Sequence, residues 1–452
     1  MSSAISDLDD LVRELHRDHF GPLVGALVGY FQLRELAQAE DLVQDTFEAA
    51  LLTWRSEGVP RDPVAWLYKV CKNKALNLVR SARERTRTDV PALELPGPAA
   101  HLDHFFLPHE LQDRQLRLLF AACHPSFPPR ARIILTLKSL AGLRIEEIAR
   151  GLGMQVEAVR KSLFRTRKAI REQNLPLRVP YVLQSRERLA SVHRVLYLVF
   201  NEGYRASRGP DVIRQELCLL ALRQVRALLD QPKVANGDTQ ALLALMLFNV
   251  ARFEARTDSE GIPIELEAQD RTVWDQELKA AGIRAFNAAR QSEVWSSYHF
   301  EAGIAALHCT APSFAATNWE AVHRLYAGLV RIAPSSFVRL NQAVATFWAL
   351  GPEAAHSTLL DLQSELAPGD FFATRAKFFE WEGRPGDALN HYLDALTATD
   401  IPSRRQFLLP RTRCTNTNPP QVTHHQWRGR PTSSRSQPGS KRPATPCRRK
   451  HG

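Results

Sequence analysis

Residues 146–168 read EEIARGLGMQVEAVRKSLFRTRK, two short runs of helical spacing that a glycine separates, with most of the positive charge in the second run. At about 100° per residue, a helix beginning at Val156 carries one apolar face: Val156, Val159, Leu163, Thr166 and Ile170. Ile148 and Leu152 supply facing apolar side chains in the first run, and Gly153 suits a left-handed turn. The pattern predicts a helix-turn-helix, with a supporting helix over residues 130–143.

The second helix of this motif has the polar face that entry into the major groove of DNA requires. On that face we expect base contacts from Glu157, Ala158 and Lys161. Contacts with the phosphate backbone are expected from four basic side chains: Arg160, Arg165, Arg167 and Lys168. A solvated surface helix bridged by ion pairs is the alternative, but the glycine turn, the supporting helix and the one-sided charge together favour DNA. Phe164 does not fit, because the projection puts it near the exposed side.

A second pattern lies in residues 39–54, AEDLVQDTFEAALLTW, which have the spacing of an amphipathic helix. Its apolar stripe consists of Val43, Phe47, Ala50, Leu51 and Trp54. Its outer face is acidic or polar: Asp41, Gln44, Asp45 and Glu48. Such a face predicts contact with a basic protein partner.

The loop over residues 55–62 leads into a third helix, for which Asp62 is the N-cap and Pro63 the first residue. Around an apolar stripe, this helix carries an aromatic ring with amide and basic side chains: Trp66, Lys69, Lys72, Asn73, Asn77, Arg80 and Arg83. Amides can read unpaired bases and aromatic rings can stack on them, so the helix predicts contact with unpaired DNA. Taken alone, the pattern also fits a generic helical bundle.

The composition as a whole predicts an all-α protein of several domains. The chain has 452 residues, enough for two to four domains. Apolar spacings of three and four prevail, and alternating β-branched runs are missing. The formal charge of +11 resides in the C-terminal end, because residues 401–452 hold twelve Lys and Arg and no Asp or Glu, which leaves −1 for residues 1–400.

Changes in composition and spacing predict the domain boundaries. We expect a first helical domain over 8–85, a linker over 86–105, a helix-turn-helix domain over 106–175, a helical extension over 180–316, repeats over 317–400 and a basic disordered tail over 401–452. The tail could attract nucleic acid or be dispensable. The acidic N-terminus is unlike a signal peptide and no apolar run is long enough to span a bilayer, so we expect a cytoplasmic protein without a membrane partner.

The expected repeats rest on positions that recur at steps of 33 and 34 residues. The three recurring sets are Ala321, Leu325 and Gly328, then Ala354, Thr358 and Asp361, then Ala388, Tyr392 and Ala395. This is the period of the tetratricopeptide helix pair, in which small residues let paired helices approach closely. Asp361 breaks the small-residue position, so generic helix pairs with accidental spacing remain the alternative.

The three DNA- and partner-binding patterns together resemble, in order and separation, the two DNA-binding regions of bacterial extracytoplasmic-function sigma factors. The resemblance implies that residues 39–51 grip the clamp helices of the largest RNA polymerase subunit. It further implies that residues 55–83 capture an unstacked base and the melted strand at the −10 element. By the same resemblance, residues 146–171 read the −35 element as duplex DNA.

The resemblance continues into the long subgroup that has a C-terminal extension with tetratricopeptide-like repeats. The segments that carry it are residues 115–137, 195–207, 241–256 and 269–275, and the likeness covers about residues 8–400. Arg144 and Gln155 stand where small capping residues are usual, which is expected to cost each helix about 1 kcal/mol. Ser162 stands where a basic residue is common, so the promoter preference is left open.

No pattern in the sequence predicts catalysis, a metal or a cofactor. Cys123 and His124 could be half of a metal site, but no partner ligands lie at zinc spacing, so a packed cysteine and a capping histidine are favoured. The six cysteines include no CxxC pair, and neither nucleotide-binding glycine motif is present. We therefore expect no enzyme.

The sequence thus predicts a sigma factor that binds core RNA polymerase and directs it to a subset of promoters. A separate anti-sigma factor, or residues 180–400 acting in cis, would regulate it. Two alternatives belong to other classes: a helix-turn-helix repressor or activator with a ligand-sensing helical domain, and a helical-repeat scaffold or enzyme whose basic helix is incidental.

Overall fold

The computed structural model describes residues 2–31, 36–86, 108–172, 185–204, 215–232, 235–258, 264–399 and 402–414. Within these residues all regular elements are helical, which confirms the predicted all-α class. The first seven helices are α1 Ser2–Phe31, α2 Leu36–Glu57, α3 Pro63–Thr86, α4 Pro108–Ala122, α5 Pro129–Ser139, α6 Ile145–Gly151 and α7 Val156–Glu172. The remaining elements are α8 Ser185–Tyr204, α9 Gln215–Leu229, α10 Gly237–Val250, the short 3-10 helix η4 Phe253–Ala255, α11 Gln276–Ala289, α12 Ser297–Thr310, α13 Trp319–Ile332, α14 Ser336–Leu350, α15 Pro352–Leu360, α16 Pro368–Trp381, α17 Pro385–Thr397 and α18 Pro402–Cys414.

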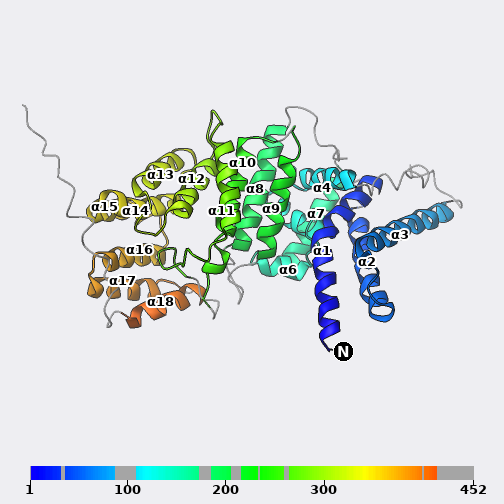
Figure 1. Cartoon of the computed structure of the whole chain (residues 1–452), viewed down its shortest axis with the longest axis horizontal. Helices are drawn as coiled ribbons and strands as arrows, with labels where there is room; N and C mark the ends of the chain where they lie inside the picture. Colours follow the sequence, from blue (N-terminus) through cyan, green and yellow to red (C-terminus); the bar gives the residue numbers. More distant parts are fainter. Residues whose placement is uncertain are drawn as a thin grey trace, which may run out of the picture.

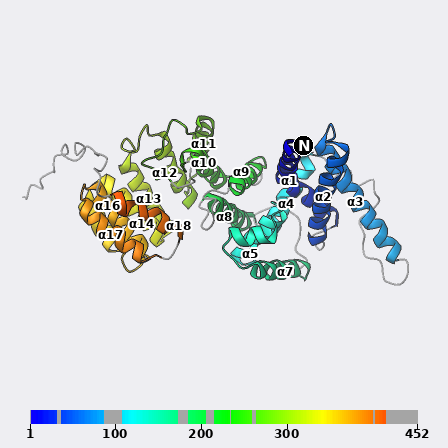
Figure 2. The same ribbon diagram turned by 90° about the horizontal axis from the view of Figure 1, so that it is seen from below.

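The helices form an elongated molecule in which order along the chain becomes order along the long axis. Helices α1 to α3 lie at one end, α8 to α11 in the middle and α13 to α18 at the other end (Figure 1). The view from below gives the same order, with α4, α5 and α7 between α8 and the end that holds α2 and α3 (Figure 2). One continuous hydrophobic core runs from Leu8 in α1 to Cys309 in α12.

A glycine stripe on α1 lets this helix lie directly against the helix-turn-helix domain. Gly21, Gly25 and Gly29 are spaced by four residues and so share one face of the helix. A Cβ atom on Gly25 would lie 3.0 Å from the backbone nitrogen of Gln115, and one on Gly21 would lie 2.6 Å from the carbonyl oxygen of Leu140. Larger side chains would therefore push α1 away from this domain.

The predicted helix-turn-helix is confirmed as α6, a turn and α7. Gly153 has a φ of 59°, in the left-handed region, and the Met154 N–H donates to the Ala149 carbonyl at 2.8 Å across the turn. The predicted apolar face of α7 is turned inward: Val159, Leu163, Thr166 and Ile170 are buried, and Val156 is half-buried.

Arg144 lacks the small capping side chain that is usual at the start of such a helix, and Glu147 of α6 takes over part of the capping. The Glu147 carboxylate accepts the backbone N–H of Arg144 at 2.8 Å. The same carboxylate lies 2.9 Å from the Arg144 guanidinium. One of the unsatisfied N–H groups at this helix end is therefore bonded without a small capping side chain.

Beyond α12 the chain folds as a row of short helices, and the recurring positions fall on every second one. Ala321, Ala354 and Ala388 lie in α13, α15 and α17 respectively. At Gly328 a Cβ atom would meet the Phe300 ring of α12 at 2.2 Å, so the small residue there permits close packing. Asp361, which breaks the pattern, is the C-cap of the short helix α15.

The prediction of a disordered tail from residue 401 is wrong for its first part, because residues 402–414 form α18. Leu408 is buried among residues of α16 and α17. Arg411 forms an ion pair with Glu265 at 2.9 Å. Composition did not reveal this helix, since Phe407 and Leu408 among basic residues are enough to dock on a neighbour. The predicted linker over 86–105 and the tail after Cys414 lie almost wholly outside the described residues.

Candidate nucleic-acid and polymerase interface

The predicted DNA-reading face of α7 is open to solvent along most of its length. Six of the seven expected contact residues are exposed: Glu157, Ala158, Arg160, Lys161, Arg165 and Lys168. Arg160 lies 3.4 Å from Glu146, and Lys168 lies 3.6 Å from Glu172, in exposed ion pairs that contribute little free energy. Phe164 is 65% exposed on the same face, as the projection predicted.

Arg167 is the exception, because its guanidinium turns toward the first domain and contacts Glu40 at the start of α2. Glu40 is only 2% exposed. Its other carboxylate oxygen accepts the Ser139 hydroxyl of α5 at 2.6 Å. Burial raises the pKa of Glu40 by more than the charge of Arg167 and the Ser139 hydrogen bond lower it. We call these three residues the interdomain latch, because they join α2 to α5 and α7.

The predicted polar residues of α3 form one exposed row. Lys69, Asn73, Asn77 and Arg80 are all exposed, at spacings that keep them on one side of the helix. Trp66 begins the row half-buried, with its ring edge-on to that of Trp54 at 5.3 Å between centroids. The helix starts where predicted, since the Asp62 carboxylate accepts the Ala65 N–H at 2.9 Å.

Two residues that were predicted with this row are not part of it as described. Lys72 is half-buried beside the row, and the side chain of Arg83 lies outside the described residues. The inner face holds Leu67, Cys71 and Ala75. Ala75 follows Cys71 by one helical turn on this face.

The predicted outer face of α2 is exposed, whereas its apolar stripe is buried. Asp41, Gln44, Asp45 and Glu48 all face solvent. Of the predicted stripe, Val43, Phe47, Ala50 and Trp54 are buried and Leu51 is half-buried. Gln44 also hydrogen-bonds His16, whose pKa is lowered mainly by burial.

The extension is fastened to both DNA-reading domains. Ser191 of α8 donates to the Cys123 carbonyl at 2.6 Å and accepts from Arg132 of α5 at 2.7 Å. Arg223 of α9 forms an ion pair with Asp18 of α1 at 2.5 Å. The sequence contained no sign of these contacts, which join residues far apart in the chain.

The pair Cys123 and His124 is placed as a packed cysteine and a capping histidine. Cys123 is fully buried, and burial raises the pKa of its thiol to about 12. The His124 Nδ1 accepts the Ser126 backbone N–H at 3.2 Å and so closes a turn. Among the described residues, no group of three His, Cys, Asp or Glu side chains could hold a metal ion.

Comparison with known protein families finds three matches along the chain. Sigma-70 region 2 matches residues 16–85, and Sigma-70, region 4 matches residues 117–170. A family of unknown function, DUF6596, matches residues 188–290. The first match covers α2 and nearly all of α3, the second covers α5, α6 and most of α7, and the third lies in the extension.

Similar individual proteins support the same division. An uncharacterized protein of Rhizobium meliloti (strain 1021) is 35% identical over 353 residues, which are 76% of this chain and 81% of the relative. The ECF RNA polymerase sigma-E factors of Escherichia coli (strain K12) and Salmonella typhimurium (strain LT2) are 33% identical over 141 residues, 30% of this chain and 74% of each relative. No solved structure matches the chain.

The two sigma-70 regions, with their helices arranged as described, define a sigma factor, a class of non-enzymatic transcription initiation factors. The chain belongs to the extracytoplasmic-function type of sigma factor and carries a helical C-terminal extension. It directs promoter-specific transcription initiation, which implies interaction with core RNA polymerase and promoter DNA. No helix in the described part of the chain is long and apolar enough to cross a membrane.

Proposed function

We propose that three exposed faces divide the work of promoter recognition in the cytoplasm, while polymerase performs all the chemistry. The −35 duplex is contacted by α7 through Glu157, Ala158, Arg160, Lys161, Arg165, Arg167 and Lys168. The melted −10 strand is contacted by α3 through Trp66, Lys69, Asn73, Asn77, Arg80 and Arg83. Polymerase is contacted by α2 through Asp41, Gln44, Asp45 and Glu48. The support is that nearly all these side chains face solvent while the apolar stripes behind them are buried.

We further propose that the described arrangement is a closed state of the free factor. The −35 and −10 elements are separated by about 25 base pairs, which is about 85 Å of straight duplex at about 3.4 Å per base pair. In the closed state α7 touches α2 through Arg167 and Glu40, and α2 packs on α3. Helices this close cannot engage both elements at once, so the interdomain latch has to open on polymerase.

The extension, in this proposal, stabilises the closed state in cis, as an anti-sigma factor would do in trans. The observation that carries the closed state is the burial of Glu40 between two DNA-reading domains, with Arg167 as its charged partner. Arg223 and Ser191 fasten α1 and α5, respectively, to the extension. A latched factor binds free DNA poorly, because one of its phosphate-contacting arginines is occupied.

Reconstitution with core polymerase tests the assignment of faces. Asp45→Lys on α2 reverses a charge on the proposed polymerase-binding face, so we expect at least roughly tenfold weaker binding to core polymerase and a matching loss of promoter-dependent transcription. Glu353→Lys makes the same change on the exposed surface of α15 and should leave both unchanged. Equal effects of the two substitutions would contradict the assignment.

A footprinting assay with the purified chain tests the closed state. We expect no specific protection of promoter DNA without polymerase, and protection of both elements with it. Specific protection by the isolated chain would instead favour a helix-turn-helix repressor or activator. Deleting the extension is a poor test, because α8 and α9 share the hydrophobic core of the DNA-reading domains.

A further inference from the structure

The C-terminal row of helices surrounds a cavity that promoter recognition does not use. Its volume is about 400 Å³, within the range of about 300–1,000 Å³ that small-molecule pockets have. The loop over residues 264–267 forms one wall, and residues of α12, α13, α14, α16 and α18 line the rest. Aromatic side chains dominate the lining: Phe314, Trp319, Tyr326, Phe378, Trp381 and Phe407. Flat aromatic ligands gain contact with such walls by stacking.

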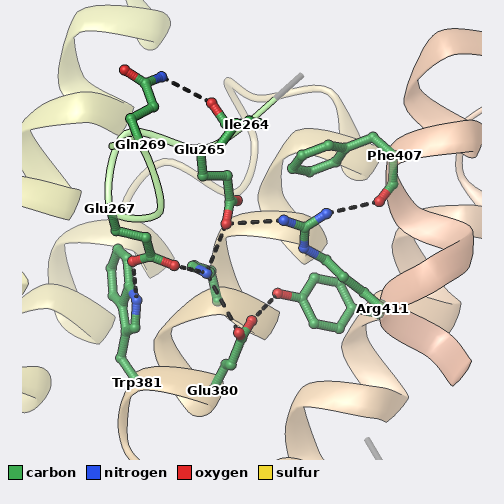
Figure 3. Close-up of polar contacts among 10 residues, drawn as sticks. Ile264, Glu265, Glu267, Gln269, Glu380, Trp381, Phe407 and Arg411 are labelled. Carbon is green, nitrogen blue, oxygen red and sulfur yellow. Dashed lines mark hydrogen bonds and ion pairs between the residues drawn. The ribbon is translucent and has the colours of Figure 1, made fainter. Parts of the chain in front are cut away.

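One end of the cavity is anionic. The carboxylates of Glu265, Glu267 and Glu380 converge in Figure 3, and Lys377 contacts all three, with its Nζ 3.0 Å from Glu265 and 3.4 Å from Glu380. Burial opposes the charge of Lys377, but the carboxylates outweigh burial and raise its pKa. Arg411 supplies the second cation, 2.9 Å from Glu265. Of these groups Glu265, Glu267 and Lys377 line the cavity itself, and two carboxylates against one ammonium group leave one net negative charge there.

His308 also lines the cavity, and one of its ring nitrogens makes no hydrogen bond to the described residues. The residue is 9% exposed, and its Nδ1 has no hydrogen-bond partner among the described residues. Burial, with Arg252 and Arg271 nearby, lowers the pKa of His308 to about 3, so the imidazole is neutral. Arg271 is itself held by the Ala311 carbonyl at 2.8 Å. An unpartnered buried imidazole nitrogen is costly unless a ligand bonds it.

We propose that this cavity binds a small aromatic amine in its singly protonated form, with its ring between the aromatic walls and its ammonium group at Glu265 and Glu267. An aromatic anion fits poorly, because Lys377, the cation in the lining, is already paired with Glu265 and Glu267. The proposal rests on the cavity alone. It stands or falls independently of how the chain binds promoters.

Calorimetric titration of the full chain with three naphthalene probes tests the charge preference. We expect 2-naphthylmethylammonium to bind one site with a Kd below about 1 mM, and 2-naphthoate to bind at least roughly tenfold more weakly. Neutral 2-naphthalenemethanol should fall between them. Glu267→Gln should weaken binding of the ammonium probe and leave that of the alcohol unchanged. Equal affinity of the ammonium and carboxylate probes would overturn the proposal.

A cavity-filling variant tests the location. Ala373 lines the cavity, so Ala373→Phe should weaken binding of the ammonium probe at least roughly tenfold. Ala354→Phe on α15 is the matched control, because Ala354 is not part of the lining. This variant should bind the probe as tightly as the wild type does. Unaltered binding by Ala373→Phe would place the probe elsewhere and reject the site. If Ala373→Phe fails to fold, as judged by thermal unfolding, the Glu267→Gln comparison decides alone.

Discussion

The two ends of the extension are built differently. Helices α8 to α12 share one hydrophobic core with α1 to α7, a cluster of buried residues that runs from Leu8 to Cys309. Helices α13 to α18 instead bury three small clusters, each joining only neighbouring helices, around Phe378, Trp319 and Tyr392. The first part of the extension is therefore a component of the DNA-reading body, whereas the rest is a row of nearest-neighbour contacts.

This difference predicts how each part responds to damage. A shared core couples its members, so loss of packing at one point should lower the stability of the whole body. A row of separate clusters should lose stability locally. A signal received by the row can thus reach the body through α12, whose Ile304 lies in one of the small clusters, or through the 264–267 loop, which Lys377 and Arg411 contact.

The largest expected effect comes from removing a ring in the shared core. Phe248 in α10 is fully buried, and Phe248→Ala should lower the free energy of unfolding of the body by about 3–5 kcal/mol. Hydrogen exchange should then be faster in α1, α5 and α7 as well as in α10. Phe378→Ala, at an equally buried ring in the row, is the matched control and should speed exchange in α14 to α17 alone. Identical exchange patterns would refute the comparison.

The next largest expected effect is a loss of stability of the body of the molecule, which includes the shared core, at acidic pH. Burial lowers the pKa of His193, in the shared core, to about 4, and its Nε2 lies 2.8 Å from the Thr239 hydroxyl. His193 takes up a proton near pH 6.5 in the unfolded chain but only near pH 4 in the folded protein. The contribution of neutral His193 to the free energy of unfolding is therefore fully present above pH 6.5 and is lost as the pH falls to about 4. The loss is about 3 kcal/mol in the unfolding free energy of the body.

Denaturant melts between pH 4 and 7 measure this loss. His193→Gln keeps a hydrogen-bonding group for Thr239 but does not titrate, so its stability should depend less on pH. If the variant and the wild type show the same pH dependence, His193 is not the responsible group.

Breaking the interdomain latch tests the closed state with a smaller effect. Arg167→Met leaves Glu40 buried without its cation, which should shift the equilibrium toward separated domains by roughly tenfold, or about 1.4 kcal/mol. Energy transfer between dyes on α3 and α7 would report the opening. Arg165→Met on the same helix removes an exposed arginine and should leave the closed state intact. Opening by both variants would argue against a specific latch.

Local features of this chain could be predicted from the sequence because helical periodicity records which face is buried. The faces of α2, α3 and α7 were anticipated in this way, including the exposed position of Phe164. Glu40 was not, because it precedes three outer-face acids, and only its partner 127 residues away distinguishes it from them. A carboxylate buried by tertiary contact has no signature in the local pattern.

The close packing of α1 and the existence of α18 were also not predicted from the sequence, for physical reasons. The glycines at 21, 25 and 29 have helical spacing, but only the position of α4 shows that their missing side chains admit another backbone. Helix α18 has a basic composition that predicts disorder, and its burial depends on the carboxylate of Glu265 and the surface of α17. In both cases the partner surface decides the structure.

The smallest expected effect concerns the N-terminal cap of α6. The sequence predicted a missing capping side chain at Arg144, and in the structure the Glu147 carboxylate accepts the Arg144 N–H instead. Glu147→Ala removes the carboxylate that accepts the Arg144 N–H, so the free energy of unfolding should fall by about 1 kcal/mol. Chemical denaturation measures it, with Glu146→Ala, an exposed neighbour in the same turn, as control. Replacing Arg144 with Ser should then add little in the wild type, because the end is already capped, but should restore stability to Glu147→Ala. A Ser substitution that stabilises both backgrounds equally would mean that Glu147 does not act as the cap.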